Sequence, residues 1–176
     1  TFLNNWSIGT GFNYEPLIIS NNALRGGSSL RAPDQFGHWF YVESDGRKKL
    51  ALFLNGWWGV SEEKTGNYYG GEFTARYQPS NALSFSANVN YNYVFKEQGQ
   101  YVTDFAIAGG RKYIVSQLDQ NTLSFTFRLN YNITPDLTIQ YYGQPFLTRP
   151  LFSKFGYVSD ALNKNLDSRF YTYSSD

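Results

Sequence analysis

Cysteine and methionine are absent from this sequence of 176 residues, and charged residues make up only 16% of it. Without cysteine the chain can form neither a disulfide nor a zinc–thiolate site. Fifteen Lys and Arg balance fourteen Asp and Glu, so we expect no nucleic-acid partner, because phosphate binding requires a basic surface. No run approaches the ~18 apolar residues of a membrane-spanning helix, which excludes a helical membrane protein.

Aromatic residues are abundant instead. Fifteen Tyr, fifteen Phe and four Trp together make up 19% of the chain. Ordinary soluble domains carry about 25% charged residues, so a chain this aromatic and this poor in charge is unusual for a soluble protein. It begins with Thr1 and shows no signal peptide, and we therefore expect a mature chain or a fragment of a longer one.

Apolar and polar residues alternate with a period of two over most of the chain, which predicts β-strands and no helix. In Leu83–Phe95 every odd position is apolar or aromatic, and five of the six even positions are Ser or Asn. Thr122–Ile133 alternates as strictly. Weaker copies of the pattern predict five further strands. These are Phe2–Tyr14, Phe36–Ser44, Lys49–Val60, Tyr69–Tyr77 and Leu137–Phe146.

Short and long connections alternate between the predicted strands. Short turns are expected at Asp45-Gly46, Pro79–Ala82 and Thr134–Asp136, and longer polar ones at 15–35, 61–67, 96–111 and after 146. This sorting is typical of outer-membrane barrels, which have tight turns at one rim and long loops at the other. A strand such as Leu83–Phe95 extends roughly 43 Å at ~3.3 Å per residue, which at a ~45° tilt crosses the ~30 Å hydrocarbon core of a bilayer.

The predicted fold class is therefore all-β: an antiparallel up-and-down transmembrane β-barrel to which this chain supplies seven strands. Residues 1–146 are expected to form the partial barrel, and residues 147–176 a long extracellular loop or an incomplete C-terminal region. Bacterial single-chain barrels have even strand numbers, so we expect further strands outside this chain. A soluble sandwich or lipocalin-like barrel that binds an apolar ligand produces the same alternation with its faces exchanged, and it stays open as an alternative.

Five segments of the C-terminal half stand in a familiar order. They are Leu118-Asp119-Gln120, Thr122-Leu123-Ser124, Arg128-Leu129-Asn130-Tyr131, Thr134-Pro135-Asp136-Leu137 and Gln140-Tyr141-Tyr142-Gly143-Gln144-Pro145-Phe146. In these segments the chain resembles a large Bacteroidetes-type outer-membrane protein family of unassigned function, whose members join an N-terminal carbohydrate-binding-module-like domain to a C-terminal β-barrel. The likeness is weak before residue 60 and good after residue 80. The resemblance implies no catalytic residues, and it implies glycan binding only through a domain that this chain does not contain.

No catalytic, metal or cofactor site is expected, and the chain is predicted not to be an enzyme. His38 is the only histidine, and we interpret it as a strand or rim residue. The segment 70–73 reads Gly-Gly-Glu-Phe, the signature of diguanylate cyclases, but that chemistry needs an α/β fold; within a strand the two glycines give aromatic rings room across the sheet. The adjacent carboxylates Glu62 and Glu63 are expected in a solvated loop.

Strand registers anchored at the turns place four polar residues in one row of the predicted inner wall. They pair Glu72 with Asn88, Asn88 with Arg128, and Arg128 with Tyr142. Neighbouring strands lie ~4.8 Å apart, so Glu72 and Arg128 are expected roughly 10 Å from each other. Either they meet over the short Asn88, as a narrow dry lumen would require, or they stay apart and solvated in a wide wet one.

The expected function is that of an integral protein of the bacterial outer membrane that acts as a pore, transporter or scaffold component. The expected partners are the lipid bilayer, other outer-membrane proteins and the missing strands of the same protein. The alternative is a barrel that anchors a surface glycan-binding or glycan-processing protein. The expected lumen residues are mostly Ser, Thr and Asn, which indicate a polar lining without identifying a cargo.

Overall fold

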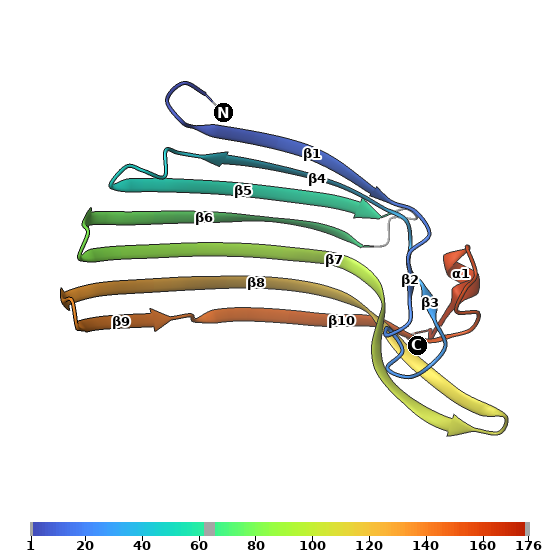
Figure 1. Ribbon diagram of the computed structural model, residues 1–176. Coiled ribbons are helices and arrows are strands. Elements are labelled where there is room, and N and C mark those ends of the chain that lie inside the picture. The colour runs from blue at the N-terminus through green and yellow to red at the C-terminus, as the bar shows by residue number, and fades with distance from the viewer. Residues whose placement is uncertain (1, 62–65, 175–176) are drawn as a thin grey trace.

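One large antiparallel sheet dominates the structure, a computed structural model that describes residues 2–61 and 66–174 (Figure 1). The strands are β1 (Ser7–Glu15), β2 (Ile19–Ser20), β3 (Leu30–Arg31), β4 (Gln35–Glu43), β5 (Leu50–Ser61), β6 (Asn67–Ser80), β7 (Leu83–Ile107), β8 (Gly110–Thr134), β9 (Leu137–Gly143), β10 (Phe146–Val158) and β11 (Phe170–Thr172). The sheet has the order β1-β4-β5-β6-β7-β8-β10-β11, β9 also pairs with β8, and β2 and β3 form a separate hairpin. The expectation of an all-β, antiparallel chain is confirmed.

The seventh predicted strand is longer than expected and is divided in two. β9 pairs with Phe127–Thr134 of β8, and β10 pairs with the preceding part of the same edge, Ile114–Ser124. Because β10 runs to Val158, the expected loop from residue 147 onward is wrong for residues 147–158. This strand was not predicted because its apolar and polar residues alternate irregularly. It also contains Pro150, and proline within a sheet is tolerated only near an edge.

A short helix, α1 (Leu166–Arg169), follows β10 and was not expected. Its N-cap is Asn165, whose side chain accepts a hydrogen bond from the backbone N–H of Asp167 at 2.9 Å. Such capping satisfies one of the free N–H groups at the start of a helix. No helix within the described ranges is long and apolar enough to cross a membrane.

The two faces of the sheet differ in chemistry. In the central strands β6, β7 and β8, odd-numbered residues from 69 to 93 and from 121 to 131 form the apolar face, and even-numbered residues form the polar face. Phe73, Val89 and Phe127 of the apolar face are 44%, 37% and 41% exposed, whereas the smaller polar residues Asn88 and Thr126 are half-buried. Contacts on the polar face also reach across an intervening strand, as in the hydrogen bond from Trp57 of β5 to Asn92 of β7. Side chains converge in this way on the concave side of a curved sheet, and we infer that the sheet curves toward its polar face.

The two ends of the sheet differ as well. Tight turns join β4 to β5, β6 to β7 and β8 to β9 at one end (Figure 1). The opposite end carries the segment with β2 and β3, the helix α1 and the extended β7–β8 hairpin, whose two strands have 25 residues each. The predicted loop 96–111 is thus part of two strands, and its tip lies at Ala108-Gly109, within the predicted tip region. Of the predicted connection 61–67, residues 62–65 lie outside the described residues.

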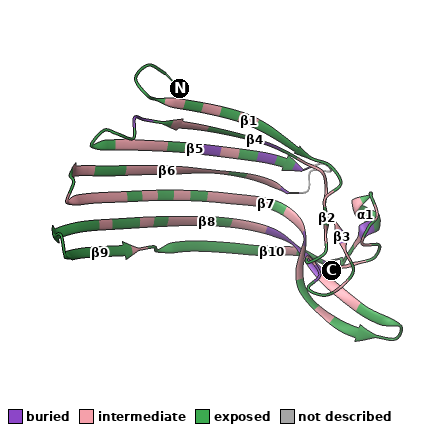
Figure 2. Cartoon of the chain, viewed as in Figure 1, coloured by how far each residue is buried: buried purple, intermediate pink, exposed green. Residues whose placement is uncertain are grey.

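Buried residues gather where these end segments meet the sheet (Figure 2). Leu24, Leu30 and Val115 form a small hydrophobic core, against which Tyr113 and Phe170 pack. It joins the segment before β4, the extended β7–β8 hairpin and the C-terminal segment. The long connections therefore form an ordered cap at this end of the sheet rather than separate loops.

The β4–β5 turn is held by an ionised carboxylate. Asp45 Oδ1 accepts hydrogen bonds from the backbone N–H and from Nε of Arg47, both at 3.0 Å. These bonds and the charge of the Arg47 guanidinium lower the pKa of Asp45 to about 2. The carboxylate therefore remains an acceptor at any ordinary pH.

Large rings on the polar face lie directly against glycines of the neighbouring strand. A Cβ added to Gly70 would lie 2.5 Å from Cζ2 of Trp57 and 2.6 Å from the backbone oxygen of Tyr91. A Cβ added to Gly11 would lie 2.6 Å from Cζ2 of Trp39. Close approach of a ring, rather than an unusual backbone conformation, therefore requires glycine at these positions. The prediction for the glycines of segment 70–73 is confirmed at Gly70 and is wrong at Gly71, where a Cβ would meet only the backbone oxygen of Asn55 at 3.3 Å.

Gly70→Ala should lower the free energy of unfolding by about 1–3 kcal/mol, because the added methyl group overlaps both the Trp57 ring and a backbone oxygen. Gly46→Ala is the matched control, since a Cβ at Gly46 meets nothing within 4 Å, and its effect should stay within about 0.5 kcal/mol. Chemical denaturation of the two purified variants gives the comparison. Equal stabilities would contradict the requirement for glycine at residue 70.

Candidate functional site

The polar face carries the side chains that are able to contact a ligand, and the predicted row lies on it. Arg128 pairs with Tyr142 as predicted. Its guanidinium carbon lies 4.7 Å from the centroid of the Tyr142 ring, a cation–π contact. On its other side Arg128 pairs with Ser86, and Ser86 pairs with Arg76. The row through Arg128 therefore holds a second cation and does not include Glu72.

The remaining pairs of the predicted row are each displaced by two residues. Glu72 pairs with Asn90 instead of Asn88, and Asn88 pairs with Thr126 instead of Arg128. Because the displacement is two, all four predicted residues keep the polar face. The structure shows no ion pair between Glu72 and Arg128, both of which lie in the described part of the chain.

A later turn and several bulges account for the displacement. β6 runs to Ser80 and pairs Ser80 with Leu83, so the β6–β7 turn lies at Asn81-Ala82, later than predicted, and the one-residue shift between Tyr77 and Ser80 offsets only part of the difference. In the β7–β8 hairpin the register shifts at three places between Val94 and Thr103, and at each of them β7 has one residue more than β8. Positive φ angles at Lys96 and Gly99, 55° and 78°, lie among these shifts. A bulge adds a residue to one strand without changing the hydrophobic period on either side.

A diagonal hydrogen bond nevertheless joins two members of the predicted row. Asn88 Nδ2 donates to Oε1 of Glu72 at 2.6 Å and lies 2.8 Å from Oγ1 of Thr74. Thr74 Oγ1 also donates to Glu72 Oε1 at 3.4 Å. The Glu72 carboxylate is thus held by neutral donors of β6 and β7, and the short Asn88 side chain is its closest partner. A contact to the more distant Arg128 is not needed to satisfy it.

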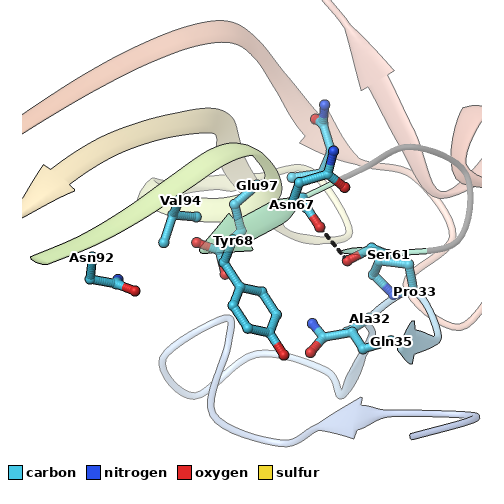
Figure 3. Close-up of a pocket in the computed structure, with 11 residues that line it drawn as sticks. Ala32, Pro33, Gln35, Ser61, Asn67, Tyr68, Asn92, Val94 and Glu97 are labelled. Atoms are coloured by element: carbon cyan, nitrogen blue, oxygen red, sulfur yellow. Dashed lines mark hydrogen bonds between the residues drawn. The ribbon is translucent and has the colours of Figure 1, made fainter. Parts of the chain in front are cut away.

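A cavity of about 270 Å³ lies where the polar face meets the cap (Figure 3). Five separate segments of the chain contribute to its wall. The lining residues are Ala32, Pro33, Gln35, Ser61, Gly66, Asn67, Tyr68, Asn92, Val94, Glu97 and Gln98. Most are neutral and polar, and Ala32 and Pro33 bring the segment before β4 close to the start of β6 and the middle of β7.

Hydrogen bonds fix several side chains of this cavity. Trp57 Nε1 donates to Oδ1 of Asn92 at 3.3 Å, and Ser61 Oγ donates to the backbone oxygen of Gly66 at 2.6 Å, the bond drawn in Figure 3. Gln98 Nε2 donates to Oε1 of Gln117 at 3.0 Å behind the cavity. The amide oxygen of Asn92 is thus oriented by a ring of the polar face.

Glu97 supplies the only ionisable carboxyl group of the described cavity wall. Burial raises its pKa above the ordinary value of 4.5, because desolvation disfavours the charged form. It lies at two of the β7 register shifts, which is why the two-residue period did not identify it. The sequence feature that could have indicated this irregular backbone is the glycine two residues later, Gly99. Its φ of 78° is one that favours glycine.

No group of three or more His, Asp or Glu side chains within residues 2–61 and 66–174 is placed to hold a metal ion. The predicted strand residue His38 lies in β4, where its Nε2 is 2.8 Å from Oγ1 of Thr10 and its ring stacks near Phe12 and Trp58. The carboxylates Glu62 and Glu63 lie outside the described residues. The site therefore offers rings, amides and hydroxyl groups, a set suited to binding.

Comparison with protein families identifies the chain at family level. A model of the family described as "Domain of unknown function (DUF5916)" matches residues 1–169, and the chain belongs to this family. No curated protein and no solved structure matches the chain. Membership therefore assigns no activity, and the function has to be argued from the geometry of the sheet.

Asn88→Asp should lower the free energy of unfolding by about 1–3 kcal/mol at pH 7, because it removes a donor and places a second carboxylate against Glu72. Glu72→Gln in the Asn88→Asp background should recover part of the loss, since the new amide donates to Asp. A double-mutant cycle from denaturant titrations measures this coupling. Additive effects of the two substitutions would show that the 2.6 Å contact contributes nothing to stability.

Stability should also depend on pH through Glu97. Because the pKa is raised in the folded state, the contribution of this group is complete below its unfolded value of 4.5 and is lost as pH rises through the folded value. Glu97→Gln should therefore gain stability relative to the native chain as pH rises from about 4 to 8. Glu43→Gln, which removes the same charge from an exposed residue, is the control, and a pH-independent difference for Glu97→Gln would refute the assignment.

Proposed function

We propose that this member of the family is part of an integral β-barrel of a bacterial outer membrane, and that its polar face lines the lumen of a pore or transporter. The apolar face then contacts lipid. The observation that carries this proposal is the combination of an exposed apolar face with curvature toward the polar face. The Bacteroidetes-type outer-membrane family that the C-terminal half resembles has the same architecture.

The extent of the exposed apolar face supports a lipid environment. Leu54 and Trp58 of β5 and Phe125 of β8 are 45%, 42% and 40% exposed, and no described segment covers them. Soluble monomers rarely expose contiguous apolar patches larger than a few hundred Å², and each exposed Å² costs about 25 cal/mol in water. A bilayer removes this cost over the whole face at once.

The direction of curvature favours this function over a soluble barrel that binds an apolar ligand. Such a barrel places its apolar residues on the concave side, around the ligand, and its polar residues outside. Here the side chains that meet across an intervening strand, Trp57 and Asn92, lie on the polar face, and large apolar side chains such as Phe73 and Phe127 are exposed on the other face. An outer-membrane barrel has this arrangement, with an apolar outer band and a polar interior.

Closure of the barrel requires strands beyond those described. Within the described residues the outer edge of β1 has no partner, and β10 is followed only by the short β11. Unpaired backbone groups are not tolerated in a bilayer. In the proposal these edges pair with strands from elsewhere in the same protein or from another outer-membrane protein.

Two adjacent residues with opposite orientations test the proposal. This chain contains no cysteine, so Phe127→Cys and Thr126→Cys, each in a full-length protein from which any cysteine outside this chain has been removed, place one nitroxide spin label at a defined position. In membranes the label at 127 should be relaxed mainly by oxygen, which dissolves in lipid. The label at 126 should be relaxed mainly by a polar nickel chelate, which reaches only a watery lumen.

The possible outcomes separate the alternatives. A soluble fold with Phe127 in a closed core shields the label at 127 from both reagents and exposes the label at 126 to both. That result would overturn the membrane proposal, as would recovery of the full-length protein in solution without detergent. Equal accessibility at the two positions would show that the sheet does not separate two environments.

A further inference from the structure

Five aromatic residues lie on the polar face of β4, β5 and β6 and are not explained by a simple hydrophilic lining. We call Phe53, Tyr41, Trp39, Trp57 and Tyr68 the aromatic track. Their positions follow from the strand registers, which pair Glu43 with Phe53, Tyr41 with Asn55, Trp39 with Trp57 and Gly59 with Tyr68. The track therefore occupies four successive rows of one face and spans roughly 20 Å along β5, at ~3.3 Å per residue.

The rings of the track lie along the sheet. Trp39 and Trp57 rest against Gly11 and Gly70, as their close approach to those positions shows. The ring planes of Trp39 and Tyr41 differ by only 10° at a centroid distance of 6.1 Å. Tyr41 and Phe53 differ by 27° at 6.2 Å. A ring that lies flat on a neighbouring strand presents its other face away from the sheet, and Trp39 is 41% exposed.

The track leads to the cavity under the cap. Tyr68 belongs to both, and Figure 3 shows its ring among the lining residues, on the same wall as Asn92. Asn92 is in turn bonded to Nε1 of Trp57 at 3.3 Å. A Cβ on Gly37 would lie 2.8 Å from Oη of Tyr68, so this ring too lies across a glycine. Rings and cavity thus form one continuous surface.

The polar face beside the track carries amides and two acidic residues. In the rows from Phe53 to Gly59, the facing residues of β1, β4, β5 and β6 include Asn13 and Asn55, and their charged members are Glu43 and Glu72. The Glu72 carboxylate is held by Asn88. An anionic ligand would meet these two carboxylates, since Arg76 lies one row beyond Phe53, and a purely apolar ligand would not use the amides.

We propose that the aromatic track binds a neutral oligosaccharide and conducts it to the cavity lined by Tyr68 and Asn92. Sugar rings have apolar C–H faces that pack on flat aromatic rings, while their hydroxyl groups bond to amides and carboxylates at the edges. The proposal deepens the proposed function and rests on it, because the track faces a lumen only if the sheet belongs to a barrel. It names neutral saccharides as the substrate class of that lumen.

Adjacent tryptophans on opposite faces provide the test. Trp57→Leu removes a ring of the track, Trp57→Phe keeps a smaller ring, and Trp58→Leu makes the same change on the apolar face. Calorimetric titration of the full-length protein in detergent uses neutral hexasaccharides of glucose, xylose, mannose and galactose, with hexagalacturonate as the anionic comparison. A neutral hexasaccharide should bind, and Trp57→Leu should raise its Kd about tenfold. Trp58→Leu should leave the Kd within about twofold, with Trp57→Phe intermediate.

Membrane insertion of each variant is measured in parallel by resistance to alkaline extraction. If the protein inserts but binds no neutral hexasaccharide, the proposed binding by the aromatic track is wrong. It is also wrong if Trp57→Leu and Trp58→Leu weaken binding equally. Preferred binding of hexagalacturonate overturns the neutral substrate class. Saccharide binding by a protein that does not insert would instead overturn the proposed function and leave the track standing as the binding surface.

Discussion

The two-residue alternation of side chains along neighbouring strands is the constraint on which the rest of this structure depends. Hydrogen-bonded strands place directly paired residues on the same face, so a consistent alternation gives the whole sheet one apolar and one polar face. Curvature toward the polar face, the exposure of Phe73 and Phe127 and the hydrogen bond between Asn88 and Glu72 all follow from this separation.

Much of the fold could be predicted because a register error of two residues leaves every side chain on its correct face of the sheet. The turn at Thr134–Asp136 fixed the β8–β9 register, including the pair Arg128–Tyr142. The β6–β7 pairing was displaced by two residues because its turn lies later than predicted. The β7–β8 pairing was displaced by two residues because bulges leave no trace in a period-two pattern. β10 was missed for a related reason: its alternation is irregular and contains Pro150.

The site was harder to predict than the sheet. The two-residue alternation of side chains correctly placed Glu72 and Asn88 on the same face. The cavity, in contrast, joins five segments that no short-range sequence pattern relates. The aromatic track was not predicted because β4 and β5 have aromatic residues at consecutive positions. Trp39 is followed by Phe40, and Trp57 by Trp58. Adjacent aromatics on opposite faces obscure a hydrophobic period, and only the register assigns each ring to its face.

The order of the strands has a consequence for how the chain reaches this structure. From β4 to β9 each strand pairs with the next along the chain, so no long crossover connection separates two paired strands. Pairings of this kind have a lower contact order than the distant pairings of a Greek-key sandwich, which favours faster folding. A hairpin can form first, with β7–β8 the longest, and later strands can then add to its edges one at a time. At every stage the sheet thus has a free edge with which the next strand can pair. The strands that are already paired do not have to rearrange.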